Sequence, residues 1–388
     1  MEIERITSGA ALDDLLATAR SEGRCALDTE FVWERTYAPR LCLAQIATAD
    51  RVAVIDPLEG ASLEPVAALV ADPGVTCVMH APAADLTGFG LHYDVHPQDV
   101  FDVQLAAGFA GLGGSLSLER VIDQSVGVQL HHAEGFTDWS KRPLTPVQVE
   151  YAADDVRHLL AAADALTARL ERQGRLSWAE EEMERRFGPE AAVVQDPDQA
   201  WRRVQGRGKL RAGQLGALVA IAAWREREAR RRDTPVAWLV RDATLIELAR
   251  RRPKTAEDAR GVRGLQLKRG PQLDGLLAAI REGEQNQPER PPETPPELRA
   301  RVRAVLPLAS SVLQARCSAA GIASELVATR DDLESLIRYA GGDGQGEPPP
   351  LLTGWRRELA GDSLLALLRG EVVLRVVPGP PHVDEQPA

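Results

Sequence analysis

Residues 24–31 read Arg24-Cys25-Ala26-Leu27-Asp28-Thr29-Glu30-Phe31, an apolar segment of strand-forming character that carries two carboxylates. Alternate side chains of a β-strand project from opposite faces, so Asp28 and Glu30 are expected on the same face. Two like charges placed that close destabilise each other unless a metal ion or a basic group neutralises them. The stretch therefore predicts a strand that contributes to a cation site, and further ligands should occur elsewhere in the chain.

The composition is that of a protein with several globular domains. The chain has 388 residues, 44% of them hydrophobic, which suffices for two or three domains. No apolar run approaches the roughly 18 residues that a membrane span needs, and the polar, acidic start is unlike a secretory signal. The four cysteines have no metal-type spacing, so buried thiols are the ordinary interpretation. We expect a reduced, cytoplasmic protein that does not bind membranes.

Charge is distributed unevenly along the chain. The formal net charge is −11, yet residues 201–282 contain 20 Lys and Arg against 9 Asp and Glu. A basic module beside an acidic one suggests that one part collects a polyanion while the other holds cations. The basic runs 225–232 and 250–254 are candidate phosphate contacts. The alternative is a solvated helix face on which Glu226 and Glu228 pair with the arginines.

The first 110 residues have the pattern of a mixed α/β domain. Strands are expected at 24–31, 41–48, 51–56 and 75–80, each rich in Val, Ile, Leu, Cys or Thr. The two-residue break Ala49-Asp50 requires a hairpin, whereas the helical pattern at 61–71 suits a crossover. Helices follow from about residue 82. The expected sheet is therefore mixed.

The clearest helix signal begins at Thr145. Thr145 can serve as the N-cap, Pro146 occupies the first helical position, and Gln148 completes a capping box. The helix is expected to run to about residue 172. From about residue 198 onward the pattern is helical, with a Pro-rich polar segment at 283–297.

Further carboxylates lie where they can meet those of the first strand. Asp85 follows the strand that ends at His80, in the expected first turn of a helix. Asp155 and Tyr151 are four residues apart on the long helix and share a face, while Asp154 should point away, about 100° round the helix. Each residue alone has a commoner structural explanation. Together they form an all-oxygen ligand set, which selects Mg²⁺ or Mn²⁺.

Several neighbouring residues have two interpretations. For Phe31, stacking on a terminal base and packing in the core are about equally expected. Core packing is favoured for Phe136 and Trp139. His80 is expected to be a satisfied structural residue and not part of the site.

These residues occur in the order and spacing of a known pattern. Asp28-Thr29-Glu30-Phe31, the segment from His80 to Asp85, and Tyr151-Ala152-Ala153-Asp154-Asp155 resemble the three motifs of the tyrosine branch of the DEDD exonuclease superfamily. Within that branch the chain resembles the bacterial ribonuclease D family. Segments that carry this likeness are 55–58, 137–139, 142–145, 199–202, 218–225 and 354–359. The family often has an acidic residue where this chain has Ala84.

The resemblance implies an α/β ribonuclease H-like exonuclease domain, with a mixed sheet and flanking helices, followed by two small all-α HRDC-like domains. The implied boundaries are an exonuclease domain at 1–190, an HRDC domain at 195–283, a Pro-rich linker at 284–296, a second, divergent HRDC-like domain at 297–372 and a disordered tail at 373–388.

The resemblance also implies an activity and its residues. The substrate would be RNA with a free 3′ end, such as transfer-RNA precursors, and the products nucleoside 5′-monophosphates. The enzyme would be a monomer that uses two divalent cations, Mg²⁺ or Mn²⁺. The implied catalytic residues are Asp28, Glu30, Asp85, Tyr151 and Asp155, of which the four carboxylates would hold the cations. The alternatives are a DNA 3′→5′ exonuclease of the same superfamily and a non-catalytic nucleic-acid-binding adaptor.

Overall fold

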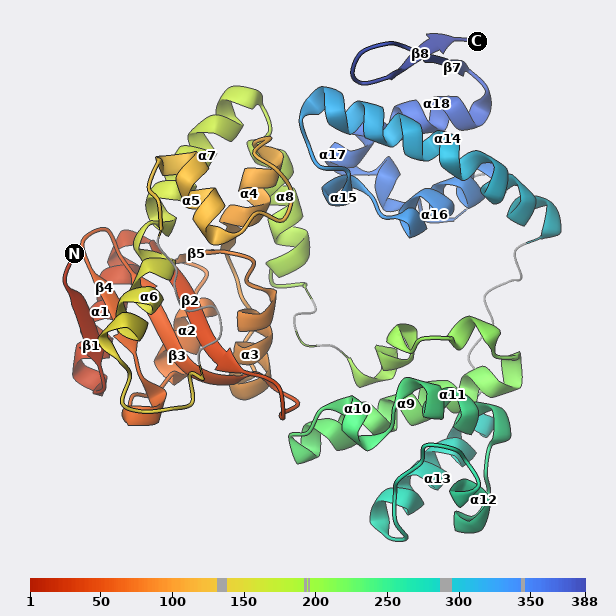
Figure 1. Ribbon diagram of the computed structural model, residues 1–388, viewed down its shortest axis with the longest axis horizontal. Helices are drawn as coiled ribbons and strands as arrows, with labels where there is room; N and C mark the ends of the chain where they lie inside the picture. The colour runs from red at the N-terminus through yellow and green to blue at the C-terminus, as the bar shows by residue number, and fades with distance from the viewer. Residues whose placement is uncertain (131–137, 192–193, 195, 287–294, 343–345) are drawn as a thin grey trace.

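The structure consists of an α/β domain and two helical domains that follow it along the chain (Figure 1). It is a computed structural model. The described residues are 1–130, 138–191, 194, 196–286, 295–342 and 346–388. Among these residues, no helix is both long enough and apolar enough to cross a membrane.

A six-stranded sheet forms the centre of the α/β domain, in the order β1-β4-β3-β2-β5-β6. The strands are β1 (Ile3–Ile6), β2 (Arg24–Val32), β3 (Arg40–Ala47), β4 (Val52–Ile55), β5 (Thr76–Met79) and β6 (Val100–Asp102). β3 is antiparallel to β2 and β4, and the other pairs are parallel. The predicted mixed sheet and its hairpin are thus confirmed. The edge strands β1 and β6 were not predicted, because such short segments carry too little periodicity.

Eight helices of the described residues belong to this domain. They are α1 (Gly9–Glu22), α2 (Glu64–Val70), α3 (Ala83–Tyr93), α4 (Val103–Phe109), α5 (Leu118–Val126), α6 (Pro146–Arg157), α7 (Leu159–Gln173) and α8 (Leu176–Phe187). α2 forms the expected crossover between β4 and β5. α6 packs against β2, β3 and β4, and so it lies over the strand that carries Asp28 and Glu30 (Figure 1).

The start of α6 follows the predicted capping box. The backbone N–H of Gln148 donates to Thr145 Oγ1 at 3.2 Å, and the backbone N–H of Thr145 donates to Gln148 Oε1 at 2.8 Å. The continuous helix expected to about residue 172 is instead two helices. α6 ends at Arg157 and α7 begins at Leu159, because His158 (φ −112°, ψ 0°) departs from helical geometry.

The first helical domain has a hydrophobic core of its own. Its elements are the 3₁₀ segments η2 (Pro197–Arg203) and η3 (Arg207–Lys209) and the helices α9 (Ala212–Arg232), α10 (Val236–Leu239), α11 (Asp242–Arg251), α12 (Ala256–Arg260) and α13 (Pro271–Gln285). Leu218, Ile221, Leu245, Leu276 and Ile280 are buried at its centre. Most of the linker predicted at 284–296 lies outside the described residues.

The second helical domain shares a continuous core with the α/β domain. Its elements are α14 (Pro296–Ala320), α15 (Ser324–Val327), α16 (Arg330–Gly341), η4 (Pro350–Leu352), α17 (Gly354–Arg356), the π-helical turn η5 (Arg357–Gly361) and α18 (Asp362–Arg369). Trp355 stacks on Trp178 of α8, with ring centroids 6.0 Å apart, and meets the ring of Phe109 edge to face at 4.9 Å.

The C-terminal segment is ordered, in contrast to the disordered tail expected at 373–388. β7 (Val372–Val376) and β8 (Val383–Pro387) form an antiparallel hairpin. Arg316 of α14 pairs with Glu385 at 2.7 Å and holds the hairpin against the domain. The expectation rested on the position of this segment at the chain terminus. The valines of β7 favour a strand, and the residues between β7 and β8 form the turn that pairs it with β8.

Candidate active site

β2 presents Asp28 and Glu30 on one face of the sheet, as its alternation predicted. Asp28 is directly opposite Gln45 of β3, and Glu30 is opposite Leu43. Just beyond Glu30 the register shifts, because β3 contains one extra residue, Cys42, before Leu41 pairs with Phe31. Such a bulge bends the strand locally and often occurs beside an active site.

Asp85 reaches the same region from the first turn of α3. The Thr29 hydroxyl donates a hydrogen bond to Asp85 Oδ1, and both residues are buried. Asp85 is therefore held by the strand that carries Asp28 and Glu30. Its charge acts on both of those carboxylates.

α6 contributes the remaining two residues. One carboxylate oxygen from each of Asp28, Glu30 and Asp155 lies within 4.8 Å of the others. Tyr151, one turn earlier, packs its ring against Trp139 with centroids 5.9 Å apart, and its pKa responds to Asp155, Glu30 and Asp28. Asp154 pairs with Arg157 Nη1 at 2.7 Å instead, so the prediction that it does not join Asp155 is confirmed.

Burial raises the pKa of all four carboxylates, and repulsion from neighbouring carboxylates adds to it for Asp28, Glu30 and Asp155. For Asp28 burial is the main cause, followed by Asp85, Asp155 and Glu30, and the pKa lies well above its ordinary value. Burial, with Asp155 and Asp85, raises the pKa of Glu30 to about 8. Burial raises that of Asp85 to about 6, against the hydrogen bond from Thr29. Burial, with Glu119 and Asp154, raises that of Asp155 to about 7. The cluster is thus strained when ionised without a counter-charge.

A buried amide beside these carboxylates also fits a cation site. Gln45 is fully buried, and among the described residues neither its amide oxygen nor its nitrogen has a hydrogen-bond partner. Directly opposite residues of an antiparallel pair share a face, so Gln45 projects beside Asp28. Oxygen donors select hard divalent cations, and the unsatisfied amide can bond the water that such ions retain. The residues present therefore fit Mg²⁺ or Mn²⁺.

Arg142 fixes the segment that leads into α6. Its guanidinium donates to both carboxylate oxygens of Asp56, at 2.7 and 2.6 Å, and Nη2 also donates to the carbonyl of Cys42 in the bulge at 2.8 Å. Asp56 is buried. This contact ties α6 to β3 and β4, and hence Tyr151 and Asp155 to the strand carboxylates. The sequence marked the segments 55–58 and 142–145 only as similar to a family and gave no sign that Asp56 and Arg142 pair. Glu119 was not predicted either, because an acidic residue in a helix carries no distinguishing signal.

The other residues singled out from the sequence have structural roles. His80 Nε2 is 3.0 Å from the carbonyl oxygen of Leu116, as expected for a satisfied histidine. Trp139 is buried, in agreement with core packing. Phe31 is partly buried against the core, and Phe136 lies outside the described residues.

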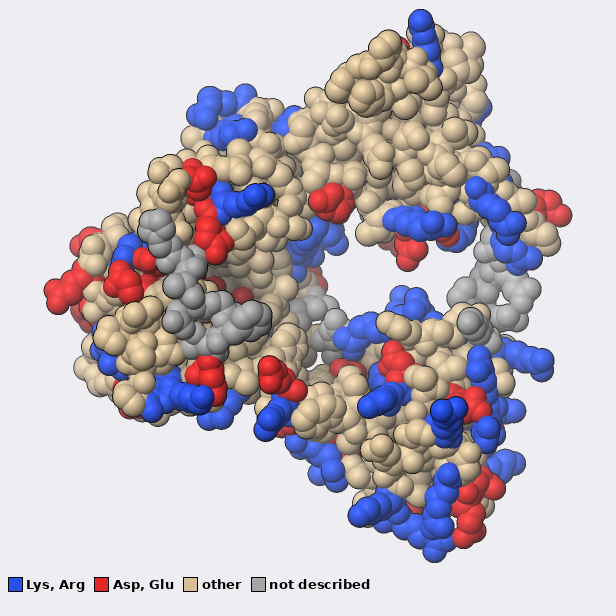
Figure 2. Space-filling view, in the orientation of Figure 1, with Lys and Arg blue, Asp and Glu red and all other residues tan. Residues whose placement is uncertain are grey.

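The two basic runs are largely engaged within their own domain. Arg225 is buried and bonds Asp242 at 2.8 Å and the carbonyl of Val240. Glu228 pairs with two arginines of the first run, and Glu247 pairs with two of the second. These contacts support the paired helix face that was the alternative to phosphate binding. Figure 2 nevertheless shows many Lys and Arg side chains exposed on the first helical domain.

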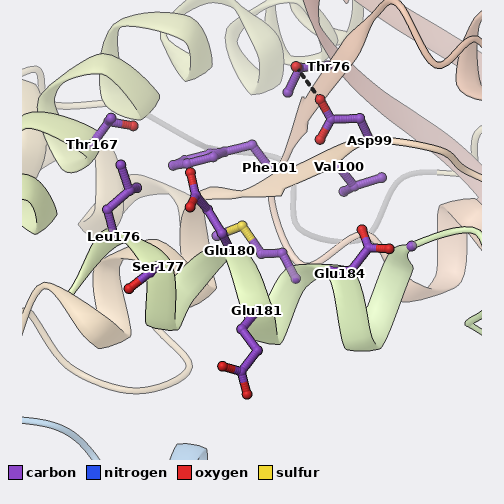
Figure 3. Close-up of a pocket in the computed structure, with 12 residues that line it drawn as sticks. Thr76, Asp99, Val100, Phe101, Thr167, Leu176, Ser177, Glu180, Glu181 and Glu184 are labelled. Carbon is purple, nitrogen blue, oxygen red and sulfur yellow. Dashed lines mark hydrogen bonds between the residues drawn. The ribbon is translucent and has the colours of Figure 1, made fainter. Parts of the chain in front are cut away.

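A separate pocket of about 630 Å³ lies between β6 and α8 (Figure 3). Asp99, Glu180, Glu181 and Glu184 contribute to its lining, and Thr76 donates a hydrogen bond to Asp99 at 2.5 Å. None of the five predicted site residues lines it. Its carboxylates would repel a polyanion, so the candidate site is the cluster on β2, α3 and α6.

Comparison with known proteins agrees with this geometry. A sequence-family model described as 3′-5′ exonuclease matches residues 3–171, and one described as HRDC domain matches residues 214–280. The chain is 40% identical to ribonuclease D of Granulibacter bethesdensis, over 96% of this chain and 94% of that protein. It is 39% identical to ribonuclease D of Acidiphilium cryptum over the same shares.

Solved structures give the same result. The crystal structure of Escherichia coli RNase D, described as an exoribonuclease involved in structured RNA processing, superposes with a TM-score of 0.78 and 33% identity. The match covers 95% of this chain and 99% of that one. A protein from Bifidobacterium adolescentis shares the fold, with a TM-score of 0.61 and 22% identity. From these near full-length relationships, the chain belongs to the ribonuclease D family of 3′→5′ exoribonucleases.

Proposed function

We propose that this protein removes nucleotides one at a time from the 3′ end of RNA and releases nucleoside 5′-monophosphates. The observation that carries the proposal is the meeting of Asp28, Glu30 and Asp155 within 4.8 Å, with Asp85 and Tyr151 beside them. Because the Escherichia coli relative is described as acting in structured RNA processing, the proposed substrates are structured RNAs with 3′ extensions, such as transfer-RNA precursors. We propose that the protein acts as a monomer.

The four carboxylates are proposed to hold two divalent cations, Mg²⁺ or Mn²⁺. Asp28 would be shared between them, Glu30 and Asp155 would serve the cation on the water side, and Asp85 would serve the other. When bound, such cations lower the pKa of water and offset the charge that develops on the leaving 3′-oxygen. The chain's own contribution is to hold four carboxylates together on β2, α3 and α6. Their raised pKa values show that ionising them together, without a cation, is unfavourable.

Tyr151 is proposed to orient the attacking water. Burial, together with Asp155, Glu30 and Asp28, raises the pKa of its hydroxyl above the ordinary value. The phenol therefore stays protonated at neutral pH and acts through hydrogen bonds, not as a base. The contact with Trp139 limits where the ring can point.

Glu30→Gln tests the cation site because it should change activity and stability in opposite directions. The variant should not hydrolyse end-labelled RNA that the wild type degrades in Mg²⁺ or Mn²⁺. In EDTA at pH 8 its Tm should be higher than that of the wild type, because one buried repelling charge is gone.

The pH dependence has a defined sign. The pKa of Glu30 is about 8 in the fold against 4.5 ordinarily, so the metal-free fold binds more protons than the unfolded chain between these values. Its stability should fall as pH rises from about 4.5 to about 8, and added cation should restore it only in the wild type. A Glu30→Gln enzyme with full activity would refute the assignment, and Glu171→Gln, which removes an exposed carboxylate near the end of α7, is the matched control.

Tyr151→Phe tests the orienting role. The turnover number should fall by about 10²- to 10⁴-fold, the range for a positioned proton-handling group, while the KM for RNA changes little. The ring contact with Trp139 is retained, so Tm should stay close to the wild-type value. An unchanged turnover number would remove Tyr151 from the mechanism. Matched RNA and DNA oligonucleotides in the same assay would measure the preference for RNA.

A further inference from the structure

An exposed tryptophan is held rigidly in the loop that follows the active-site strand. Trp33 lies one residue beyond β2 and is 45% exposed. Its indole N–H donates to the carbonyl of Tyr37 at 2.9 Å, and Phe31 meets its ring edge to face with centroids 6.2 Å apart. Trp33 therefore presents an oriented aromatic face to solvent. An exposed indole ring does not gain the free energy that burial of its apolar surface would provide, so a ligand that covers the ring would be favoured.

This ring forms one wall of a pocket of about 360 Å³ between the α/β domain and the first helical domain. The loop after β2, helix α3 and the first helical domain each contribute to it. Its lining includes the side chains of Trp33, Tyr37, Leu91 and Arg203 together with two carboxylates, Glu34 and Glu226. A volume near 300 Å³ or above is typical of sites for small organic groups.

Two segments that carry active-site carboxylates also contribute to the lining of the pocket: the end of β2 with its following loop, and α3. Trp33 lies three residues after Glu30, which corresponds to about 10 Å along an extended chain. Leu91 lies six residues after Asp85 on α3, which corresponds to about 9 Å along a helix. A stacked single strand that starts at the carboxylates spans this distance with about three nucleotides, at roughly 3.4 Å each.

The wall from the first helical domain is fixed by polar contacts. The Tyr37 hydroxyl donates to Glu226 at 3.0 Å, and Arg203 lies 3.4 Å from the same carboxylate. The side chain of Arg203 remains 46% exposed. The carboxylate of Glu226 is thus engaged by Tyr37 and Arg203, and that of Glu34 lies on the α/β side of the pocket. The aromatic face and the exposed guanidinium are the pair of features that grips single-stranded nucleic acid.

We propose that this pocket is a nucleotide subsite, in which Trp33 stacks on an unpaired base of the RNA a few nucleotides upstream of the scissile bond. Arg203 contacts the adjoining phosphate. The inference rests on the proposed function, since it assigns a second grip to the same RNA. Stacking on an aromatic ring tolerates every base, which suits an enzyme that moves along a strand.

The test uses full-length Asp28→Asn protein, which should leave RNA intact, and single-stranded RNAs that each lack one base at a different position from the 3′ end. Binding is followed by fluorescence anisotropy in Mg²⁺. One upstream position should show a loss of affinity of about tenfold, the size of one lost stack. Adding Trp33→Ala should weaken intact RNA similarly and abolish the loss at that position, because both changes remove the same contact.

Two further variants separate stacking from a general disturbance. Trp33→Phe retains a ring and should restore the position-specific loss. Trp238→Ala removes a tryptophan that is 64% exposed on α10 and does not line the pocket, and it should leave the profile unchanged. The proposal would be overturned if affinity did not depend on the position of the missing base. It would also be overturned if the losses of binding free energy from Trp33→Ala and from the missing base were additive. The pocket would then bind another ligand, such as a peptide.

The proposed function is checked separately with the wild-type enzyme and a short trinucleotide. Release of nucleoside monophosphate together with a flat binding profile would overturn the subsite alone. A failure to release nucleotide from any RNA would overturn the function instead.

Discussion

The two helical domains differ in how they are joined to the α/β domain. The first encloses its own core. The catalytic domain contacts it through the ring of Tyr37, which packs on that core, and through hydrogen bonds of Tyr37 and Ala38 with Glu226 and Asp233. The second has no separate core, because its buried side chains continue those of the α/β domain. The chain order α/β, helical, helical therefore does not describe three equivalent units.

This difference assigns different tasks to the two domains. A large apolar interface makes its two sides one cooperative unit, whereas a small polar one permits relative motion. The second helical domain should thus contribute to the stability of the catalytic domain. The first can adjust its position while an RNA substrate is held, at little cost to the fold.

The largest effect is expected for Trp355→Ala in the shared core. Trp355 is 1% exposed and contacts Trp178 and Phe109 of the α/β domain. Removing a buried aromatic side chain costs about 3–5 kcal/mol. Both the second helical domain and the catalytic domain should unfold at lower temperature, in one transition measured by calorimetry.

The matched control is Trp238→Ala, which removes an exposed tryptophan and should change the free energy of unfolding by at most about 0.5 kcal/mol. Two separate transitions in the Trp355→Ala protein, with the catalytic domain melting as in the wild type, would contradict the shared core.

A smaller effect is expected from the ionic part of the same interface. Glu182 of α8 is fully buried and accepts hydrogen bonds from Arg356 at 2.8 Å and from Arg185 and Arg186 at 2.6 Å each. Arg356→Met should cost about 2 kcal/mol, less than the usual loss for a broken buried pair, because two arginines remain.

The pH dependence identifies the contribution of Glu182. Burial alone would raise its pKa, but the hydrogen bonds from Arg185 and Arg356 outweigh burial and lower the pKa to about 2. The folded pKa lies below the ordinary 4.5, so this stabilisation is complete above pH 4.5 and is lost as pH falls toward 2. The stability curves of wild type and Arg356→Met should converge in that range. Parallel curves would show that Arg356 acts by packing alone.

Local signals in the sequence predicted the parts of the molecule that depend on neighbouring residues. Alternation along β2 placed Asp28 and Glu30 on one face, and the capping box at Thr145 placed the start of α6. The position of Asp85 after a strand, in the first turn of a helix, made it a candidate, and the resemblance to a family then assigned it to the same site as Asp28 and Glu30.

Contacts between distant segments could not be predicted in this way. Arg142 and Asp56 are 86 residues apart, and Arg356 and Glu182 are 174 apart. An arginine on a polar helix or loop has the same local pattern whether it is solvated or buried against a carboxylate. The attachment of the second helical domain, and the pocket beside Trp33, therefore required the three-dimensional structure.

The smallest effect on stability is expected at the polar junction of the first helical domain. Asp233 Oδ1 accepts hydrogen bonds from the backbone N–H groups of Tyr37 and Ala38, at 3.0 and 3.2 Å. Asp233→Ala should lower the free energy of unfolding by only about 1 kcal/mol, since these bonds are partly exposed to water. It should, however, speed hydrogen exchange at the amides of Tyr37 and Ala38, because their acceptor is gone.

Asp233→Asn is the matched control for this junction. Asparagine keeps an acceptor oxygen and tolerates the left-handed backbone of this position (φ +46°). Exchange at the two amides should therefore stay slower than in Asp233→Ala. If Asp233→Ala instead lowered the stability of the catalytic domain as much as Trp355→Ala, both helical domains would be integral to it. The distinction between the second helical domain, which shares the core of the α/β domain, and the first, which has its own core, would then be wrong.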